Sequence, residues 1–228
     1  MAVYVSGGTA FMGGYDYYSS SVSPYEGLIW KCTALGCASE ETTGKTWLGV
    51  RRMGGSSATN SWAAAYTGVF AAAGGNFSAR PNVPIATLED VTPTSPTDAW
   101  AGGTAGTLIH YDGTAWSIVA SGTTAPIDRL KSFSASSVLA SGTFGVRRFN
   151  GTSWSATGQT TAVDGMWPES ATEFWVAQAG TALRRSGSTS TNMTPWVTPT
   201  GVQIKAVSGS SPTDVWLMGP KLELLVKP

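Results

Sequence analysis

Charged residues are scarce in this sequence, and neither sign predominates. Only 12% of the 228 residues are Asp, Glu, Lys or Arg, and 14 basic side chains balance 14 acidic ones. Proteins that bind nucleic acid or an anionic membrane surface gather basic side chains into a patch, and this chain has no surplus from which to build one. We therefore expect no nucleic-acid partner.

Long apolar runs are also missing. No stretch approaches the roughly 20 apolar residues that a membrane-spanning helix needs. The segment Met1–Gly8 contains no basic part leading into a long apolar part, so no signal peptide is recognised there. The sequence predicts no membrane span.

Histidine and cysteine are nearly absent. His110 is the only histidine and no Gly-x-Ser-x-Gly turn accompanies it, so a Ser-His-Asp triad is not indicated and His110 is interpreted as a packing or surface residue. Cys32 and Cys37 flank a short loop, and cysteines that face each other across a hairpin can form a disulfide. We predict this disulfide, with two free thiols as the alternative. A bridge suits a secreted protein.

What the sequence does contain is an internal repeat. The segments Ser95–Trp100 (SPTDAW) and Ser211–Trp216 (SPTDVW) are nearly identical, and their tryptophans lie 116 positions apart, close to three times 39. The interval fills in with a column of large side chains at a period of about 38–41 residues. The column consists of Trp62, Trp100, Leu139, Trp175 and Trp216, and Tyr4 begins it, displaced by an insertion.

A second motif follows the column. Tyr111–Trp116 (YDGTAW) matches Phe149–Trp154 (FNGTSW), and Asp-Gly or Asn-Gly between apolar runs is a strong hairpin signal. Each period then holds four strands, which is the length of a propeller blade. The sequence predicts an all-β fold, a β-propeller of five or six four-stranded blades, with a solenoid or sandwich as alternatives. The turn residues, whose side chains should accept local backbone N–H groups, are Asp98, Asp112, Asn150 and Asp214.

The repeats predict a single propeller domain over residues 1–228. The expected blades are 1–45, 46–84, 85–126, 127–162, 163–201 and 202–228. Ala2–Ser6 is interpreted as a second strand and Leu222–Val226 as a third strand, so both ends of the chain fall inside repeats. This pattern indicates a fragment of a longer protein and allows self-association through incomplete blades.

From residue 46 onward the motifs resemble the tandem propeller repeats of large secreted bacterial surface proteins, notably myxobacterial ones. Those repeats read like SSPTDVWAVG followed by GTILHWDGTSW, and the Cys32–Cys37 hairpin fits a Cys-pair hairpin of such proteins. The chain is also similar in fold to lectin-like and sialidase-like propellers, but the Asp-box spacing of sialidases is not met at Asp112 and Trp116. The resemblance implies a propeller at the cell surface or outside the cell and specifies function poorly.

One insertion, from Met12 to Tyr25, breaks the period. Its tyrosines, Tyr15, Tyr17, Tyr18 and Tyr25, stand among Ser and Gly, and tyrosine offers flat, amphipathic contact area at low entropic cost. By strand order the insertion shares a face with the connections between blades. We predict that it binds a glycan or small-molecule ligand. The alternative is a loop that folds back on its own blade.

Charges gather on the first strands, which line the channel of a propeller. The carboxylates that could hold Ca²⁺ or another divalent metal are Glu89, Asp90, Asp128 and Asp164. A ring of ion pairs with nearby cations is the favoured alternative. On the third strands, Arg147–Arg148 and Arg184–Arg185 occupy equivalent positions and suit bidentate recognition of carboxylate or phosphate, or else form solvated edges.

Two functional hypotheses follow. The first is a non-catalytic recognition module without a cofactor, which binds carbohydrate or another cell-surface ligand. The second is a hydrolase of the ester or phosphotriester type, in which a divalent metal at the channel mouth activates water. A purely structural domain within a large surface protein is a third interpretation.

Overall fold

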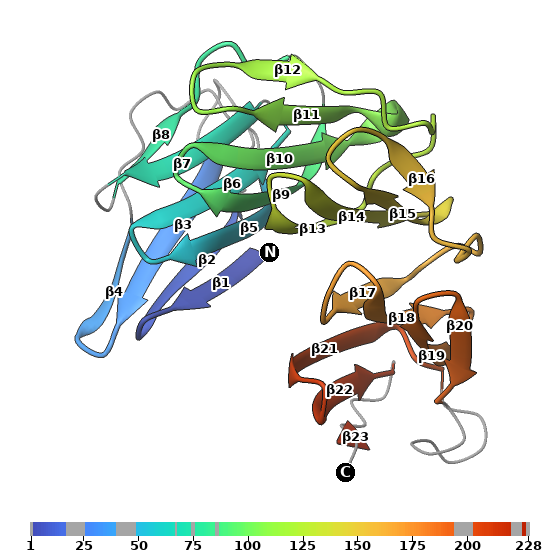
Figure 1. Cartoon of the computed structure of the whole chain (residues 1–228). Coiled ribbons are helices and arrows are strands. Elements are labelled where there is room, and N and C mark those ends of the chain that lie inside the picture. Colours follow the sequence, from blue (N-terminus) through green and yellow to red (C-terminus); the bar gives the residue numbers. More distant parts are fainter. Residues whose placement is uncertain are drawn as a thin grey trace. The chain divides into compact units, whose positions relative to one another are not determined.

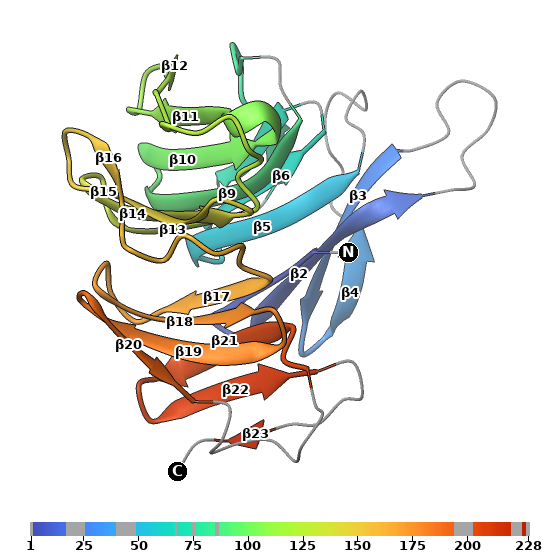
Figure 2. The ribbon, with the colours of Figure 1, turned by 90° about the vertical axis from the view of Figure 1, so that its right-hand side faces the viewer.

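The computed structural model describes residues 2–16, 26–39, 49–66, 68–73, 76–84, 87–193, 203–219 and 225–226. Antiparallel strands dominate these residues, and a short 3-10 turn, η1 (Thr104–Gly106), interrupts them. The chain divides into two compact units, Met1–Ala135 and Ser136–Pro228. Figures 1 and 2 show the strands in two views at right angles. The described part contains no helix of the length and apolarity that crossing a bilayer requires.

Three four-stranded antiparallel sheets make up most of the first unit. The first sheet contains β1 (Ala2–Ser6), β2 (Thr9–Asp16), β3 (Glu26–Thr33) and β4 (Gly36–Ser39). The second contains β5 (Val50–Ser57), β6 (Asn60–Ala65), β7 (Gly68–Ala73) and β8 (Asn76–Ala79). The third contains β9 (Leu88–Ser95), β10 (Asp98–Gly103), β11 (Leu108–Tyr111) and β12 (Trp116–Ile118). The unit ends with β13 (Arg129–Ser134), the first strand of a fourth sheet ordered β13-β14-β15-β16.

The second unit contains the remaining strands of the fourth sheet and two further sheets. The fourth sheet continues with β14 (Ser137–Gly142), β15 (Gly145–Phe149) and β16 (Trp154–Ala156). The fifth contains β17 (Gly165–Pro168), β18 (Glu173–Gln178), β19 (Thr181–Ser186) and β20 (Thr189–Asn192). The sixth contains β21 (Ala206–Ser211), β22 (Asp214–Met218) and β23 (Leu225–Val226). Each sheet lies within one of the six ranges that the repeat predicts, and its strands pair in chain order.

The first repeat is shifted by one strand from its expected phase. Ala2–Ser6 is the first strand of its sheet and not the second, because it pairs with β2 through a Gly7-Gly8 turn. This turn stands where other repeats have Ser-Pro-Thr-Asp, so the sequence signature is lost there. Tyr4 is therefore not a column residue, and Phe11, which is fully buried on β2, takes that place. β2 also continues to Asp16, so the insertion does not begin at Met12.

Within each unit, column side chains pack one sheet against the sheet that follows it. Trp62 and Trp175 are at most 1% exposed. Trp62 shares a core cluster with Leu88 and Val91 of the third sheet, and Trp175 shares one with Val207 of β21. The interpretation of this column as packing between neighbouring blades is confirmed.

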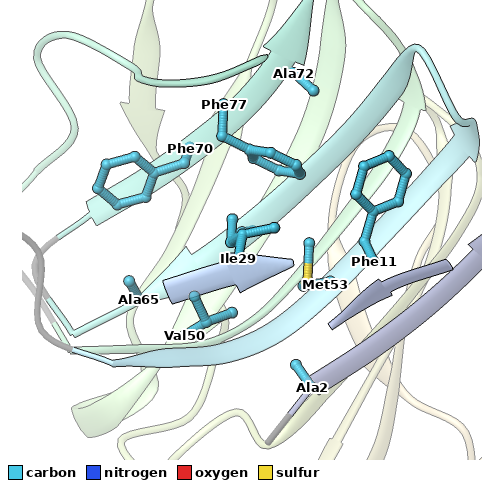
Figure 3. Close-up of a cluster of buried hydrophobic side chains, with 10 residues drawn as sticks. Ala2, Phe11, Ile29, Val50, Met53, Ala65, Phe70, Ala72 and Phe77 are labelled. Atoms are coloured by element: carbon cyan, nitrogen blue, oxygen red, sulfur yellow. The ribbon is translucent and has the colours of Figure 1, made fainter. Parts of the chain in front are cut away.

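An apolar cluster joins the first and second sheets (Figure 3). Phe11 and Phe77 meet edge to face with ring centroids 5.7 Å apart, and Ile29, Val50 and Met53 lie beside them. Aromatic pairs in this geometry contribute about 0.5–1.5 kcal/mol beyond the burial of their area. β6 is buried at every position and supplies Ala63 and Ala65 to this cluster.

Glycine is required at the turn between the second and third strands. Gly106 (φ +69°) and Gly145 (φ +89°) occupy this turn in the third and fourth sheets. A Cβ atom would lie 2.0 Å from the carbonyl oxygen of Thr123 at the first position and of Gln159 at the second. Both the left-handed backbone and the close approach exclude any other residue.

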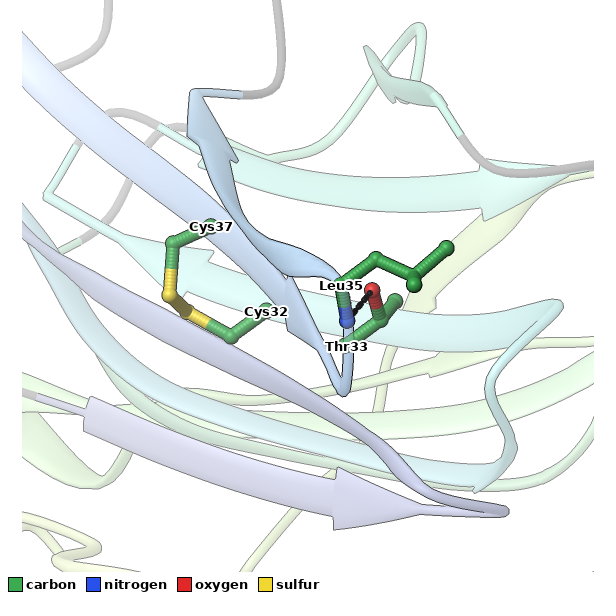
Figure 4. Close-up of a disulfide and its surroundings, with 4 residues drawn as sticks. All are labelled: Cys32, Thr33, Leu35 and Cys37. Carbon is green, nitrogen blue, oxygen red and sulfur yellow. Dashed lines mark hydrogen bonds between the residues drawn. A yellow bond between two sulfur atoms is a disulfide. The ribbon is translucent and has the colours of Figure 1, made fainter.

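The predicted disulfide is present. Cys32 and Cys37 lie directly opposite each other in the hairpin of β3 and β4 and are bonded (Figure 4). At the tip, the Leu35 N–H donates to Thr33 Oγ1 at 3.2 Å. The bridge closes a hairpin whose outer strand is exposed along its length, so it stabilises a segment that contributes little to the core.

Candidate functional site

The predicted tyrosine contacts lie largely outside the described residues. Tyr17, Tyr18 and Tyr25 are not among these residues. Of Tyr15 the structure gives only the backbone, which pairs with Gly27 across β2 and β3. Ligand binding by these tyrosines therefore stays a prediction.

The charged first strands form ion pairs between successive blades. Arg51 on β5 contacts Glu89 on β9, with Nη2 2.5 Å from Oε2, and its Nη1 donates to the Tyr66 hydroxyl at 3.0 Å. In the second unit, Lys205 Nζ lies 3.5 Å from Asp164 Oδ2. With the Arg52–Asp90 pair at 4.0 Å, three of the four candidate metal ligands are paired with cations, as the ion-pair alternative expects.

Asp90 is the one deeply buried carboxylate among the four, with 5% exposure. Its Oδ1 accepts the Val91 N–H at 2.8 Å, and its Oδ2 accepts the Leu130 N–H of β13 at 2.8 Å. Burial raises the pKa of Asp90 to about 6, although Arg52, the two N–H groups and Arg129 all act to lower it. Asp90 ties two neighbouring first strands together.

Asp128 is half-buried beside Arg129 and Glu89. Burial raises its pKa, with Glu89 adding to the shift and Arg129 opposing it. Burial also lowers the pKa of Arg129, whose Nη1 donates to the Asp128 backbone carbonyl at 2.7 Å. Within the described ranges, no group of three or more His, Cys, Asp or Glu side chains could hold a metal ion. The hydrolase hypothesis rests on the sequence alone.

His110 packs, as its sequence context indicates. Its ring stacks on Trp100 with centroids 4.2 Å apart, and its Nε2 lies 2.9 Å from Asp98 Oδ2.

The turn aspartates differ in what their carboxylates bind. Asp98 bonds the side chains of His110 and Thr94, so the expectation that it accepts local backbone N–H groups is wrong. That expectation is confirmed at Asp112, which accepts the N–H groups of the two residues before Trp116 at 2.9 Å and has its pKa lowered to about 2 by these bonds.

The arginines of the third strands have separate environments. Arg184 lies opposite Trp175 and bonds Glu169 at 3.3 Å and Glu173 at 3.4 Å. Arg147 donates to a backbone carbonyl, that of Trp154, at 3.2 Å.

Strand register also decides which third-strand residues are equivalent. The residues opposite the column are Lys31, Ala71, His110, Arg148, Arg184 and Val226. The expected equivalence of Arg147–Arg148 with Arg184–Arg185 is therefore wrong by one position, because Arg148 corresponds to Arg184.

A pocket of about 300 Å³ opens within the second unit. It lies where β15 and the end of β16 face β18 and the β17–β18 and β19–β20 turns, which lie at the same end of the fifth sheet. The residues that line it are Arg148, Ala156, Thr157, Ala171, Thr172, Phe174, Gly187 and Ser188. Apart from Arg148, none of these was singled out from the sequence, because a pocket between sheets leaves no local pattern.

Two arginines project toward this pocket from facing sheets. Residues directly opposite in an antiparallel pair share a face. Arg148 lies opposite Leu139, whose side chain packs on the fifth sheet, and Arg185 lies opposite Phe174, which lines the pocket. Arg185 is only 7% exposed, and its Nη2 donates to the Thr157 carbonyl at 3.1 Å. Neither arginine forms an ion pair within the described part of the chain.

No family model matches the sequence, and no curated protein matches it. Solved structures match its fold. The WD40 β-propeller domain of Doa1 aligns with a TM-score of 0.70 at 10% identity, over 99% of this chain and 77% of that chain. A chain of the mitotic checkpoint complex aligns with a TM-score of 0.68 at 11% identity, over 95% and 69%. YCF48 bound to D1 peptide aligns with a TM-score of 0.59 at 12% identity, over 78% and 67%.

These likenesses concern the fold. Together with the sheets of both units, they show that the chain is an all-β propeller of about six blades. The predicted fold class is confirmed. The resemblance to myxobacterial, lectin-like or sialidase-like propellers stays a prediction.

Proposed function

We propose that the protein is a non-catalytic recognition module that binds a segment of a partner protein in the pocket between β15–β16 and the fifth sheet. The observation that carries this proposal is the pocket itself, in which Arg148 has no hydrogen-bond or ion-pair partner among the described residues. At about 300 Å³ the pocket is at the lower end of ligand sites, which suits one side chain with its adjoining backbone.

The fold supports this proposal. A propeller holds its pockets between rigid sheets, so a bound segment meets a preformed site and little ordering cost is added. Among its fold neighbours, YCF48 is bound to a D1 peptide, and another neighbour is a chain of the mitotic checkpoint complex. Peptide recognition is therefore a use to which this architecture is put.

Glycan recognition is the second ligand class that the sequence indicates. It depends on Tyr15, Tyr17, Tyr18 and Tyr25, whose side chains lie outside the described residues. Whichever ligand class it binds, we propose that the protein is secreted or located at the cell surface, since the Cys32–Cys37 disulfide suits an oxidising compartment.

Blocking the pocket tests the proposed function. A library of random, end-capped heptapeptides is enriched on the immobilised protein, and the enriched peptides are measured by calorimetry. Ser188→Trp places an indole on the exposed rim and should weaken binding about tenfold or more, because a filled pocket cannot admit a side chain.

The matched control is Thr191→Trp, also exposed but opposite Arg184 and hence on the other face of the fifth sheet. It should bind like the unmodified protein. If no peptide is enriched, or if Ser188→Trp binds as tightly as Thr191→Trp, the pocket is not the recognition site.

A further inference from the structure

The pocket of the second unit carries positive charge that nothing in the described residues neutralises. Arg148 and Arg185 approach it from facing sheets, and neither has a carboxylate partner within the described ranges. The next arginine along β19, Arg184, shows the contrast, since it is paired with Glu169 and Glu173 on the opposite face. A buried guanidinium without a counter-ion is destabilising, and a ligand anion removes that cost.

The hydrogen bonds of Arg185 leave its charge available. Its Nη2 donates to the backbone carbonyls of Thr157 at 3.1 Å and Ser188 at 3.5 Å, which are neutral acceptors on two walls of the pocket. Its Nε is buried and has no hydrogen-bond partner among the described residues. Arg185 therefore fixes the pocket's walls and adds to its potential, while the half-exposed Arg148 is the group free to meet a ligand.

The other walls are apolar or small. Phe174 is buried against the pocket, and Ala156 and Ala171 add methyl groups. Such walls suit a short aliphatic stem that ends in a charged group, because methylenes gain from contact with the ring while the charge reaches the arginine. A glutamate side chain has this shape.

The corresponding place in the first unit, between the second and third sheets, is filled. Ala71 lies opposite Trp62, where the fourth sheet has Arg148 opposite Leu139. Tyr111 lies opposite Ala99, where the fifth sheet has Arg185 opposite Phe174. There the Arg80 Cζ lies 4.8 Å from the ring centroid of Trp62 and 5.6 Å from that of Tyr111, so cation–π contacts stabilise the guanidinium charge.

We propose that the pocket binds the side chain of a glutamate in a partner peptide, with the carboxylate on the Arg148 guanidinium and the methylenes against Phe174. This inference rests on the proposed function and names its ligand. Arg–carboxylate pairs are frequently bidentate, which gives direction as well as strength and discriminates against the neutral amide of glutamine.

Two peptide libraries test the proposal. Both consist of N-acetylated, C-amidated heptapeptides with neutral flanking residues, one with glutamate at the centre and one with glutamine. The glutamate peptides should bind the unmodified protein about tenfold to a hundredfold more tightly, as expected for a hydrogen bond between charged groups. Arg148→Gln should abolish this preference, and Arg148→Lys should keep part of it, because lysine retains the charge without the planar fork.

The control is Arg147→Gln, on the same strand but facing the other way, which should keep the preference. Circular dichroism and thermal unfolding verify that each variant is folded. Equal binding of both libraries, with Ser188→Trp still blocking, overturns the glutamate proposal and leaves peptide recognition intact. Enrichment of neither library overturns both. Tighter binding of a sialic-acid-terminated oligosaccharide than of any glutamate peptide also overturns it, in favour of a glycan carboxylate.

Discussion

At the scale of the residue, Asp90 shows that burial can raise the pKa of a carboxyl group even where its neighbours favour the charged form. Its carboxylate accepts two backbone N–H groups, and the Arg52 Nε lies 4.0 Å away. The Arg52 side chain is 37% exposed, so water weakens its attraction. Burial dominates, and the pKa rises from 3.8 to about 6. The folded protein therefore holds a proton that the unfolded chain has already lost between about pH 4 and pH 6.

This makes the free energy of unfolding depend on pH in a definite direction. Because the folded state binds the extra proton, the contribution of Asp90 to stability is present below pH 4 and is lost as the pH rises through 6. In Asp90→Asn, which cannot titrate, that loss is absent. We expect the stability of the unmodified protein relative to Asp90→Asn to fall by on the order of 2–3 kcal/mol between pH 4 and pH 7.

Urea denaturation of both proteins at several pH values measures this difference. The asparagine amide cannot accept both N–H groups, but that penalty is the same at every pH and cancels. A stability difference that stays constant from pH 4 to pH 7 contradicts the prediction.

At the scale of the element, the large side chains of successive sheets compensate for one another. Trp62 shares its cluster with the small Ala99 of the next sheet. Leu139 takes the column position of the fourth sheet, and the next sheet has Phe174 where the third has Ala99. The two interfaces are thus filled by pairs of similar total volume, the large–small pair Trp62–Ala99 in one and the medium–large pair Leu139–Phe174 in the other.

A double substitution tests this compensation. Leu139→Trp alone should destabilise the protein by about 1–3 kcal/mol through overpacking, and Phe174→Ala alone by about 3–5 kcal/mol through the cavity it leaves. Together they recreate the Trp–Ala pair of the first unit, so the double variant should be more stable than the sum of the two effects by about 1–3 kcal/mol. Guanidinium unfolding of the four proteins gives this coupling. Additivity within about 0.5 kcal/mol means that the two side chains do not compensate.

The elements also show where sequence reasoning succeeds and where it stops. The Ser-Pro-Thr-Asp and Asp-Gly turns predict where strands end because their chemistry is local. Strands joined by such turns then pair with each other in chain order. The sequence pattern places the first repeat one strand out of phase, because its Gly7-Gly8 turn lacks the Ser-Pro-Thr-Asp motif. The pocket depends on register: Arg185 lies on the same face as Phe174, which lines the pocket, and Arg184 lies on the other face. The spacing of the two arginine pairs does not predict this difference of one residue.

At the scale of the whole molecule, the scarcity of charge decides how copies of the protein behave toward one another. The chain has 14 basic and 14 acidic residues and a single histidine. Histidine is the one side chain that ordinarily titrates between pH 5 and pH 8, and Asp90 adds a second group near pH 6. The net charge thus stays close to zero across this range, and electrostatic repulsion between molecules is weak.

Solubility should therefore form a broad plateau and not a sharp minimum. Precipitation by polyethylene glycol, measured from pH 3 to pH 9, should give nearly constant and low solubility between about pH 6 and pH 8. It should rise several-fold below pH 4, where the carboxylates are protonated and the 14 basic residues dominate. The exposed outer strand β20 offers a control, since Thr189→Glu with Thr191→Glu adds two negative charges without touching the core and should raise solubility on the plateau. A steep change in solubility between pH 6 and pH 8 contradicts this account, because it requires several further groups that titrate there.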